Sequence, residues 1–330
     1  MPPAPNPGRL LELSGAYWQT CALHAAVKLD LFTALGRSFM SPGRIAAALE
    51  TDERAVRMLV NALTAMGLLH RDKDRYGNSE ESSRFLDKAS PTYQGHIILH
   101  HRQLMPSWTR LDEAVRTGGP VRERLSLQDA ETREHFLMGM FNLAMGLAPR
   151  VTAALDLQGR RRLLDLGGGP GTYALHFCRR HPALTAVVFD LPETRPFAEK
   201  IIGRFELADR VVFEPGNYRD TPLPGVFDVI WISHILHAEN ADTCRELIGK
   251  AAAALVSGGL MVIHDFFLNE AMDGPLFPTL FALNMLLGTE GGQSYAYAQV
   301  EAMMTEAGLQ GIERRPLATP NDSGLLIGTK

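Results

Sequence analysis

The sequence predicts an α/β protein: its larger part is a Rossmann-like doubly wound sheet, and its smaller N-terminal part is mostly helical. Three observations support this fold class. After Arg160, long helical stretches give way to short apolar segments. These segments alternate with helical ones, and a glycine-rich turn at 167–171 follows the first of them. Strands and helices that alternate in this way form a parallel sheet with helices on both faces.

Length and composition limit the class of protein. The 330 residues exceed one average domain, and 45% hydrophobic residues can bury a sizeable core, so two domains are expected. No apolar run approaches the roughly 20 residues of a membrane helix. The proline-rich segment 1–9 carries no signal pattern and is expected to be a disordered tail. A net charge of −4 gives no general attraction to nucleic acid or to anionic lipid.

The cysteine pattern indicates a reducing compartment. Cys21, Cys178 and Cys244 are odd in number and widely spaced. Such a pattern favours free thiols packed in helices or in the core over disulfides or a zinc cluster. We therefore expect a cytoplasmic protein.

The first domain is expected at residues 10–92. Apolar residues recur at helical spacing over 10–35, a second helix opens at 41–45 with a proline near its start, and a third follows at 53–69. A polar turn at 71–78 between short strands completes the element order of a winged helix.

The third of these helices argues against DNA reading. It offers Arg54, Arg57 and Asn61, but its other positions are largely apolar, which does not suit a DNA groove. A helix buried in an interface or a core fits better, so the domain is interpreted as a dimerisation domain. A cofactor-sensing DNA-binding regulator is the alternative from another functional class.

Two further helices, over 94–116 and 128–155, are expected to link the domains and to lie on the substrate side, as a region spanning 93–158. The remaining residues, 159–330, form the predicted catalytic domain. Its seven expected strands are 163–166, 185–189, 210–213, 227–232, 259–265, 310–315 and 323–328.

The glycine-rich turn and the acids around it predict a nucleoside site. Glycines let the backbone turn sharply and approach a ligand. Asp190, at the end of the second strand, can accept hydrogen bonds from two ribose hydroxyls. Glycines alone are weak evidence, and the spacing differs from the dinucleotide pattern. Asp165, two residues before Gly167, suits a cationic group such as the amino group of S-adenosylmethionine.

The ends of the later strands carry the candidate catalytic groups. Ligands of such sheets bind beyond the carboxyl ends of the strands, which places Ser233 to His237 and Asp265 near the site. His234 and His237 are three residues apart and are expected to share a helical face. No third donor at metal-ligand spacing accompanies them, so no metal is expected. One histidine suits a general base, although a structural hydrogen bond is the commoner role of a lone histidine.

Four stretches resemble one family. They are residues 164–171, 188–192, 235–237 and 274–292, the last being the most specific. In these, and more loosely from about Leu11 onward, the chain resembles the small-molecule S-adenosylmethionine-dependent O-methyltransferases. That family includes acetylserotonin O-methyltransferase and plant and bacterial phenol O-methyltransferases.

The resemblance implies metal-independent methyl transfer in a homodimer, with S-adenosylmethionine as the cofactor and a small, aromatic hydroxyl compound as the acceptor. A histidine at the position of His237 removes the acceptor's proton, and an acid at Asp265 orients it. The expected cofactor residues are Asp165, Gly167, Gly168, Gly169, Asp190, Leu191, Asn217, Tyr218 and Ser233. The expected acceptor residues are His234, Asn284, Met285, Met145, Phe141 and Phe281, although methionine and aromatic side chains are more often core.

The chain also departs from the family pattern. Ala238 stands where the family has an acid after the base, Ser294 stands where it has a glutamate, and Glu290 is the only nearby substitute. Asn217 replaces an aspartate on the adenine side. These changes keep C- or N-methylation, or non-methylating chemistry on the same fold, open as alternatives. The identity of the acceptor is not encoded in any one motif.

Overall fold

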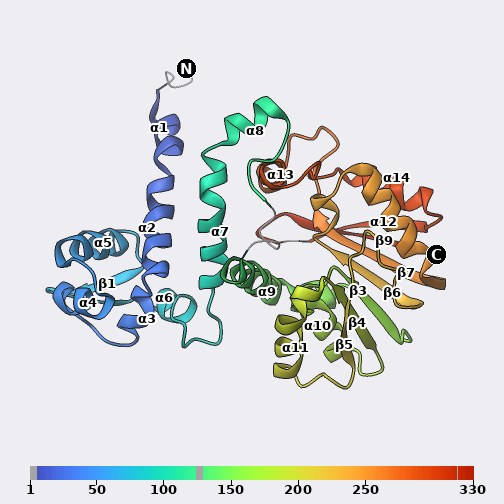
Figure 1. Ribbon diagram of the computed structural model, residues 1–330, viewed down its shortest axis with the longest axis horizontal. Helices are drawn as coiled ribbons and strands as arrows, with labels where there is room; N and C mark the ends of the chain where they lie inside the picture. The colour runs from blue at the N-terminus through green and yellow to red at the C-terminus, as the bar shows by residue number, and fades with distance from the viewer. Residues whose placement is uncertain (1–5, 124–128, 318) are drawn as a thin grey trace, which may run out of the picture. The chain divides into compact units, whose positions relative to one another are not determined.

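The computed structural model describes residues 6–123, 129–317 and 319–330. It divides the chain into two compact units, Met1–Leu104 and Met105–Lys330 (Figure 1). Part of the tail expected at 1–9 lies outside the described residues, and the first helix already begins at Gly8. The finer division at residues 92 and 158 stays a prediction. Among the described residues, no helix combines the length and the apolar character needed to cross a membrane.

The first unit is helical with one small hairpin. Its elements are α1 (Gly8–Gly15), α2 (Tyr17–Lys28), α3 (Leu31–Leu35), α4 (Pro42–Leu49), α5 (Glu53–Ala65), β1 (Leu69–Asp72), β2 (Arg75–Asn78) and α6 (Glu80–Phe85). Helix α7 (Gly95–Trp108) runs from this unit into the second one.

Several predicted boundaries in this unit are wrong. The single helix expected over 10–35 is three helices, and Asp30, with a left-handed φ of 58°, separates α2 from α3. The helix expected to reach Leu69 ends at Ala65, because Gly67 turns the chain with a φ of +77°. The hairpin is present, but its turn is confined to Lys73 and Asp74.

Helix α5 buries its apolar face in the core of its own unit. Val60 and Leu63 are fully buried, whereas Met58, on the other face, is 60% exposed. Its polar groups are also engaged within the unit: Tyr76 donates to Asn61 Oδ1 at 2.6 Å, and Arg57 pairs with Asp74 and with Glu53. The interpretation of this helix as a core element is therefore supported, while the winged-helix designation stays a prediction.

The second unit is built on the predicted seven-stranded sheet, with strand order β5-β4-β3-β6-β7-β9-β8. Strands β3 to β7 pair with one another in parallel, whereas β9 is antiparallel to its two neighbours, β7 and β8. The strands are β3 (Arg162–Leu166), β4 (Thr185–Asp190), β5 (Val211–Pro215), β6 (Phe227–Ser233), β7 (Leu255–Phe266), β8 (Gln310–Pro316) and β9 (Ser323–Thr329).

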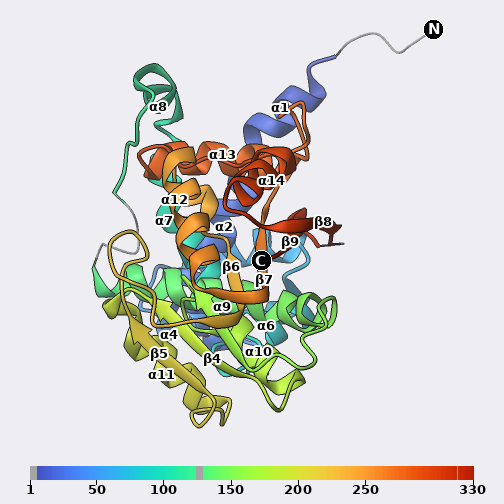
Figure 2. The same ribbon diagram turned by 90° about the vertical axis from the view of Figure 1, so that its right-hand side faces the viewer.

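Helices cover both faces of this sheet, as Figure 2 shows. Helices α9, α10 and α11 pack on one face, and α12 and α14 pack on the other. The helices of the unit are α8 (Leu111–Thr117), α9 (Ala130–Ala153), α10 (Thr172–Arg180), α11 (Arg195–Arg204), α12 (Ala241–Ala253), α13 (Leu276–Gly288) and α14 (Tyr297–Glu306). The helix expected over 94–116 is interrupted near Arg110, so that α7 and α8 are separate.

Strand β6 shows why the sheet segments are continuously apolar in sequence. Val229 and Trp231 belong to the core under α9 and α10, whereas Ile230 and Ile232 belong to the core under α12 and α14. Side chains alternate between faces along a strand, so a strand buried on both faces needs apolar residues throughout.

The strand order reverses between β3 and β6. From β3 the chain proceeds outward to β4 and β5, and then returns to place β6 on the other side of β3. Ligands of open α/β sheets bind at such a switch point, beyond the carboxyl ends of the strands. This location brings the turn after Leu166 and the segment after Ser233 to one edge.

Candidate active site

The turn after β3 needs glycine for two physical reasons. Gly167 and Gly169 have φ values of +70° and +53°, which other residues rarely adopt. A Cβ on Gly167 would lie 2.3 Å from Ile235 Cδ1, and one on Gly168 would lie 2.6 Å from Asp165 Cγ. The backbone of this turn therefore lies close to the end of β6 and provides a cradle without side chains.

Asp165 lies beneath this turn with 1% of its surface exposed. Its Oδ2 accepts a hydrogen bond from Ala174 N at 3.3 Å, in the first part of α10. Burial raises the pKa of Asp165 to about 7, and the charge of Asp190 raises it as well. A cation bound nearby would favour the ionised carboxylate.

Asp190 joins the ends of β3 and β4. Its Oδ2 accepts from Gly169 N at 2.8 Å, and its Oδ1 accepts from Leu191 N at 2.7 Å and from Thr194 Oγ1 at 3.0 Å. Burial raises the pKa of Asp190, while these hydrogen bonds oppose the shift. A carboxylate has about four acceptor positions, so capacity for a ligand hydroxyl remains.

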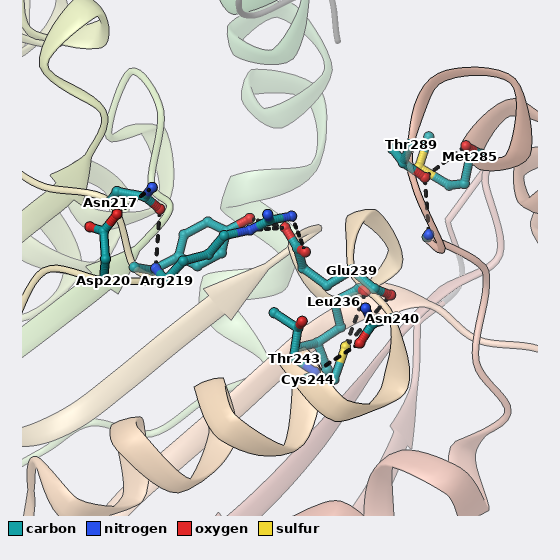
Figure 3. A network of polar contacts seen from close by, with 12 residues as sticks. Asn217, Arg219, Asp220, Leu236, Glu239, Asn240, Thr243, Cys244, Met285 and Thr289 are labelled. Carbon is teal, nitrogen blue, oxygen red and sulfur yellow. Dashed lines mark hydrogen bonds and ion pairs between the residues drawn. The ribbon is translucent and has the colours of Figure 1, made fainter. Parts of the chain in front are cut away.

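The loop after β5 is held by a buried acid that the sequence analysis did not assign. Asn217 uses its side chain within the loop, where its Oδ1 accepts from Arg219 N at 3.1 Å and its Nδ2 donates to Asp220 Oδ2 at 3.3 Å. Glu239 accepts from Tyr218 Oη at 2.6 Å and forms an ion pair with Arg219 (Figure 3). Tyr218 and Arg219 therefore tie this loop to the segment after β6.

Ser233, at the end of β6, is engaged by a buried histidine. Its Oγ lies 2.9 Å from His264 Nδ1, and His264 Nε2 lies 3.0 Å from Ser323 Oγ. Burial holds the pKa of His264 well below its ordinary value, so this ring is neutral. The hydroxyl of Ser233 thus belongs to a structural chain of hydrogen bonds.

His237 and Asp265 form the central pair of the site. His237 Nδ1 donates to Asp265 Oδ1 at 2.6 Å, and His237 N lies 3.4 Å from Asp265 Oδ2. Burial acts to raise the pKa of Asp265, but His237 and His234 hold it far below its usual range, so the carboxylate is ionised. An acceptor on Nδ1 fixes the tautomer and leaves Nε2 with a lone pair for a proton.

His234 approaches the same carboxylate oxygen from another direction. Its Nδ1 lies 3.6 Å from Asp265 Oδ1, beyond hydrogen-bond length. Burial lowers the pKa of His234. The predicted shared helical face is not present, because only a single 3-10 turn, η3 (Leu236–Ala238), follows β6. The rings of His234 and His237 converge because both face β7.

His234, His237 and Asp265 are also the group of described residues whose ligand atoms could surround a metal ion, with all three atoms within 4.8 Å. The sequence analysis placed Asp265 near the site but did not count it as a third donor, because Asp265 lies on β7 and not at ligand spacing along the chain. Two ligands about 2 Å from a tetrahedral zinc ion lie roughly 3.3 Å apart. The 2.6 Å contact between His237 and Asp265 is shorter and matches a charge-assisted hydrogen bond instead.

Helix α13 supplies the predicted acceptor-side residues. Phe281 meets His237 edge-on, with ring centroids 4.7 Å apart. Asn284 is buried one turn further along, and its Oδ1 accepts from Arg122 Nη2 at 3.3 Å. Met285 is buried, and its carbonyl oxygen accepts from Thr289 Oγ1 at 2.7 Å (Figure 3).

The two predicted acceptor residues of α9 are placed differently. Phe141 packs against the core cluster that contains Trp231, and Met145 is half-buried. Within the described residues, neither has a recorded ring or hydrogen-bond contact with His237. Their role at the acceptor stays a prediction.

Two positions of the family comparison are now located. Ser294 is buried and donates to the carbonyl oxygen of Pro278 at 2.8 Å, whereas Glu290 is exposed.

Phe266, which the sequence analysis did not select, stacks on His237 with ring centroids 5.7 Å apart. Its position directly after Asp265 at the end of β7 is the signal that could have identified it.

Comparisons with known proteins cover the whole chain. A family model described as the O-methyltransferase domain matches residues 110–310, and one described as the O-methyltransferase dimerisation domain matches residues 11–88. A 3-hydroxy-5-methyl-1-naphthoate 3-O-methyltransferase from Streptomyces sahachiroi is 31% identical, over 100% of this chain and 97% of the relative. The N,N-dimethyltransferase OxyT from Streptomyces rimosus is 29% identical, over 91% and 90%.

Solved structures share the fold. An O-methyltransferase family protein from Burkholderia thailandensis has a TM-score of 0.90 at 31% identity, with 99% of each chain covered. Human N-acetylserotonin methyltransferase in complex with SAM has a TM-score of 0.89 at 24% identity, covering 100% of this chain and 99% of that one.

Gly292 provides a test of the packing around His237. A Cβ there would lie 2.4 Å from Thr289 Oγ1 and 2.6 Å from the carbonyl oxygen of His237. We expect Gly292→Ala to lower the free energy of unfolding by about 1–3 kcal/mol, measured by chemical denaturation, because the loop must shift. Gly249→Ala is the control, since no atom lies within 4 Å of its added Cβ in the middle of α12. The control should gain up to about 1 kcal/mol. Equal effects of the two substitutions would contradict the packing described.

Proposed function

The chain belongs to the S-adenosylmethionine-dependent O-methyltransferase family, and from this premise we propose that it methylates an aromatic hydroxyl group with His237 as general base and without a metal. The observation that carries the proposal is the buried pair of His237 and Asp265 beside Phe281. A base whose Nδ1 is held by a carboxylate presents Nε2 to a hydroxyl group, and aromatic side chains next to it suit a flat, apolar acceptor.

The residues around the β3 turn fit the cofactor. No atom lies within 4 Å of a Cβ added at Gly169, which leaves room for a ligand there. Asp190 has capacity for ribose hydroxyls, and Asp165 can balance an ammonium group. When bound, S-adenosylmethionine supplies a sulfonium methyl group, to which the acceptor oxygen bonds as the carbon–sulfur bond breaks and its electron pair stays on sulfur. Burial of the site excludes water from this displacement.

The pair of His237 and Asp265 removes the proton of the acceptor hydroxyl. His237 Nε2 takes the hydroxyl proton as the oxygen becomes the nucleophile, and the charge of Asp265 stabilises the imidazolium that forms. The hydrogen bond between Nδ1 and Oδ1 is retained in both protonation states, so the ring need not turn. The 2.6 Å length of this contact is that of a charge-assisted hydrogen bond, which is the role that the proposal gives to Asp265.

Substitution of the pair tests this assignment. We expect His237→Ala to lower the rate of methyl transfer to 1-naphthol by about 10²–10⁴-fold, because the base is removed. Asp265→Asn, which removes the charge, should lower it by about 10-fold or more. Transfer is measured with methyl-labelled cofactor, and His70→Ala, at an exposed position of β1, is the control.

Three results would contradict the assignment. Undiminished transfer in His237→Ala would exclude the base, and loss of activity with a chelator, restored by a divalent ion, would exclude metal independence. Methylation of 1-naphthylamine with none of 1-naphthol would favour nitrogen as the acceptor atom, as the name of one relative suggests.

The acid under the glycine turn predicts a pH dependence. The pKa of Asp165 is raised to about 7, so its ionised form is gained as the pH rises through 7 and is lost below it. If Asp165 balances the cofactor's ammonium group, the affinity for S-adenosylmethionine falls by up to about tenfold per pH unit below 7. The affinity is measured by calorimetric titration of the protein with S-adenosylmethionine between pH 5.5 and 7.5. Asp165→Asn should flatten the profile and exposed Asp156→Asn should not. Parallel profiles for the wild type and Asp165→Asn would contradict this role.

We further propose that the chain forms a homodimer through its first unit. Exposed apolar side chains on α1 and α2 support it, among them Leu11 at 66% and Trp18 at 69% exposure. The match to the dimerisation-domain model begins at residue 11 and includes both of these side chains.

We also propose a cytoplasmic location, which accords with the three free cysteines and is tested by cell fractionation.

Sedimentation tests the dimer. We expect the wild type to sediment as a dimer and Leu11→Glu with Trp18→Glu to sediment as a monomer, because two charges enter the apolar surface. Val226→Glu, at an exposed apolar position before β6, is the matched control and should stay dimeric. A monomeric wild type, or a dimer that survives both substitutions, would contradict this interface.

A further inference from the structure

Arg122 is a largely buried cation without an acidic partner. Its Nη2 donates to the main-chain oxygen and to Oδ1 of Asn284, both at 3.3 Å. Its Nε is buried and has no hydrogen-bond partner within the described residues. No described carboxylate pairs with it. The residues outside the description, at 1–5, 124–128 and 318, contain neither Asp nor Glu.

Such an arrangement costs free energy unless a ligand compensates for it. Burial lowers the pKa of Arg122, which reflects the cost of holding its charge away from water. An arginine side chain keeps its proton even so. The guanidinium group of Arg122 has five N–H donors, and the two carbonyl oxygens of Asn284 accept only from Nη2. The remaining donors suit an anion that arrives from outside the chain.

The guanidinium group is held in place by the end of α13. Val121 N and Arg122 N both donate to the carbonyl oxygen of Leu287, at 3.0 and 3.2 Å. Gly288 makes room for the side chain, since a Cβ at that position would lie 2.4 Å from Arg122 Cζ. The backbone and the missing side chain therefore fix the position of the cation before any ligand binds, which reduces the entropy cost of binding.

Helix α13 connects this cation to the proposed base. Phe281 contacts His237, and Asn284, which Arg122 contacts, lies three residues further along the same helix. Residues three apart lie on one face of a helix, with about 5–6 Å between their Cβ atoms. A flat acceptor with its hydroxyl at His237 can thus extend along this face and present a second group to Arg122.

We propose that Arg122 binds a carboxylate of the acceptor, so that the preferred substrates are hydroxyaryl carboxylic acids. This inference rests on the proposed function. The planar guanidinium group matches a carboxylate in a bidentate geometry through its two terminal nitrogens, and Nη1 carries no hydrogen bond to described residues. The amide of Asn284, held by Nη2, lines the same position.

The test compares matched acceptors. The probes are 3-hydroxy-1-naphthoate and 6-hydroxy-2-naphthoate, each against its carboxamide, with kcat/KM measured at saturating S-adenosylmethionine. We expect the wild type to favour at least one carboxylate by about 10–100-fold. In Arg122→Gln this ratio should fall to about 1, and Arg122→Lys should retain part of it. Arg116→Gln, at an exposed arginine of α8 that pairs with Asp112, is the matched control and should keep the full ratio.

The outcomes separate this inference from the function on which it rests. Methylation of the carboxamides without any preference for the carboxylates overturns the role of Arg122 and leaves the proposed function standing. A proportional loss of kcat/KM for both members of a pair in Arg122→Gln, with the ratio retained, shows a structural role and also overturns the inference. Absence of transfer to all four probes and to 1-naphthol removes both proposals. Calorimetric titration of the S-adenosylhomocysteine complex with each naphthoate and its carboxamide gives the ratio of their affinities without catalysis.

Discussion

The site depends on how the chain stabilises one buried carboxylate. Asp265 is ionised although it lies in the interior, and an unpaired charge there would cost several kcal/mol. It therefore collects donors: the ring and the main-chain nitrogen of His237, and Phe266 N at 2.8 Å. The short turn η3 has the shape that allows one residue to donate twice. The position of His237, the proposed base, is therefore a consequence of the charge of Asp265 on β7.

The aromatic surroundings of the base follow from the same strand. Phe266 comes directly after Asp265, stacks on His237, and meets Phe281 at 4.7 Å. Helix α13 is thereby fixed over the base, and the positions of Asn284 and of Arg122 beyond it follow from the helical repeat. In the proposed arrangement a flat acceptor lies between His237 and Arg122, and the same packing then determines which substrates fit.

Local patterns predicted the parts of the protein that local physics determines. Short apolar runs predicted the strands, and the glycines predicted the sharp turn that Asp190 holds through Gly169 N, since both depend on residues within about thirty positions. The break near Asp30 and the antiparallel β9 were missed, because neither has a strong sequence signal. Arg122 could not be predicted at all: its partner Asn284 is 162 residues away, and no motif surrounds it. Asp265 was expected beside His237, but spacing along the chain did not reveal that His234, His237 and Asp265 bring three possible ligand atoms together.

The departure after the base also has a physical explanation. Ala238 replaces the family acid, but Glu239 follows directly, just outside the 3-10 turn and with extended backbone angles (φ −122°, ψ 156°). Its carboxylate accepts a hydrogen bond from Tyr218 Oη and pairs with Arg219, both in the loop after β5. Glu239 is buried, so this pairing is required for its charge. In the proposed mechanism the two acids have separate tasks: Asp265 orients His237, and Glu239 fastens the loop after β5 to the short turn that carries His237.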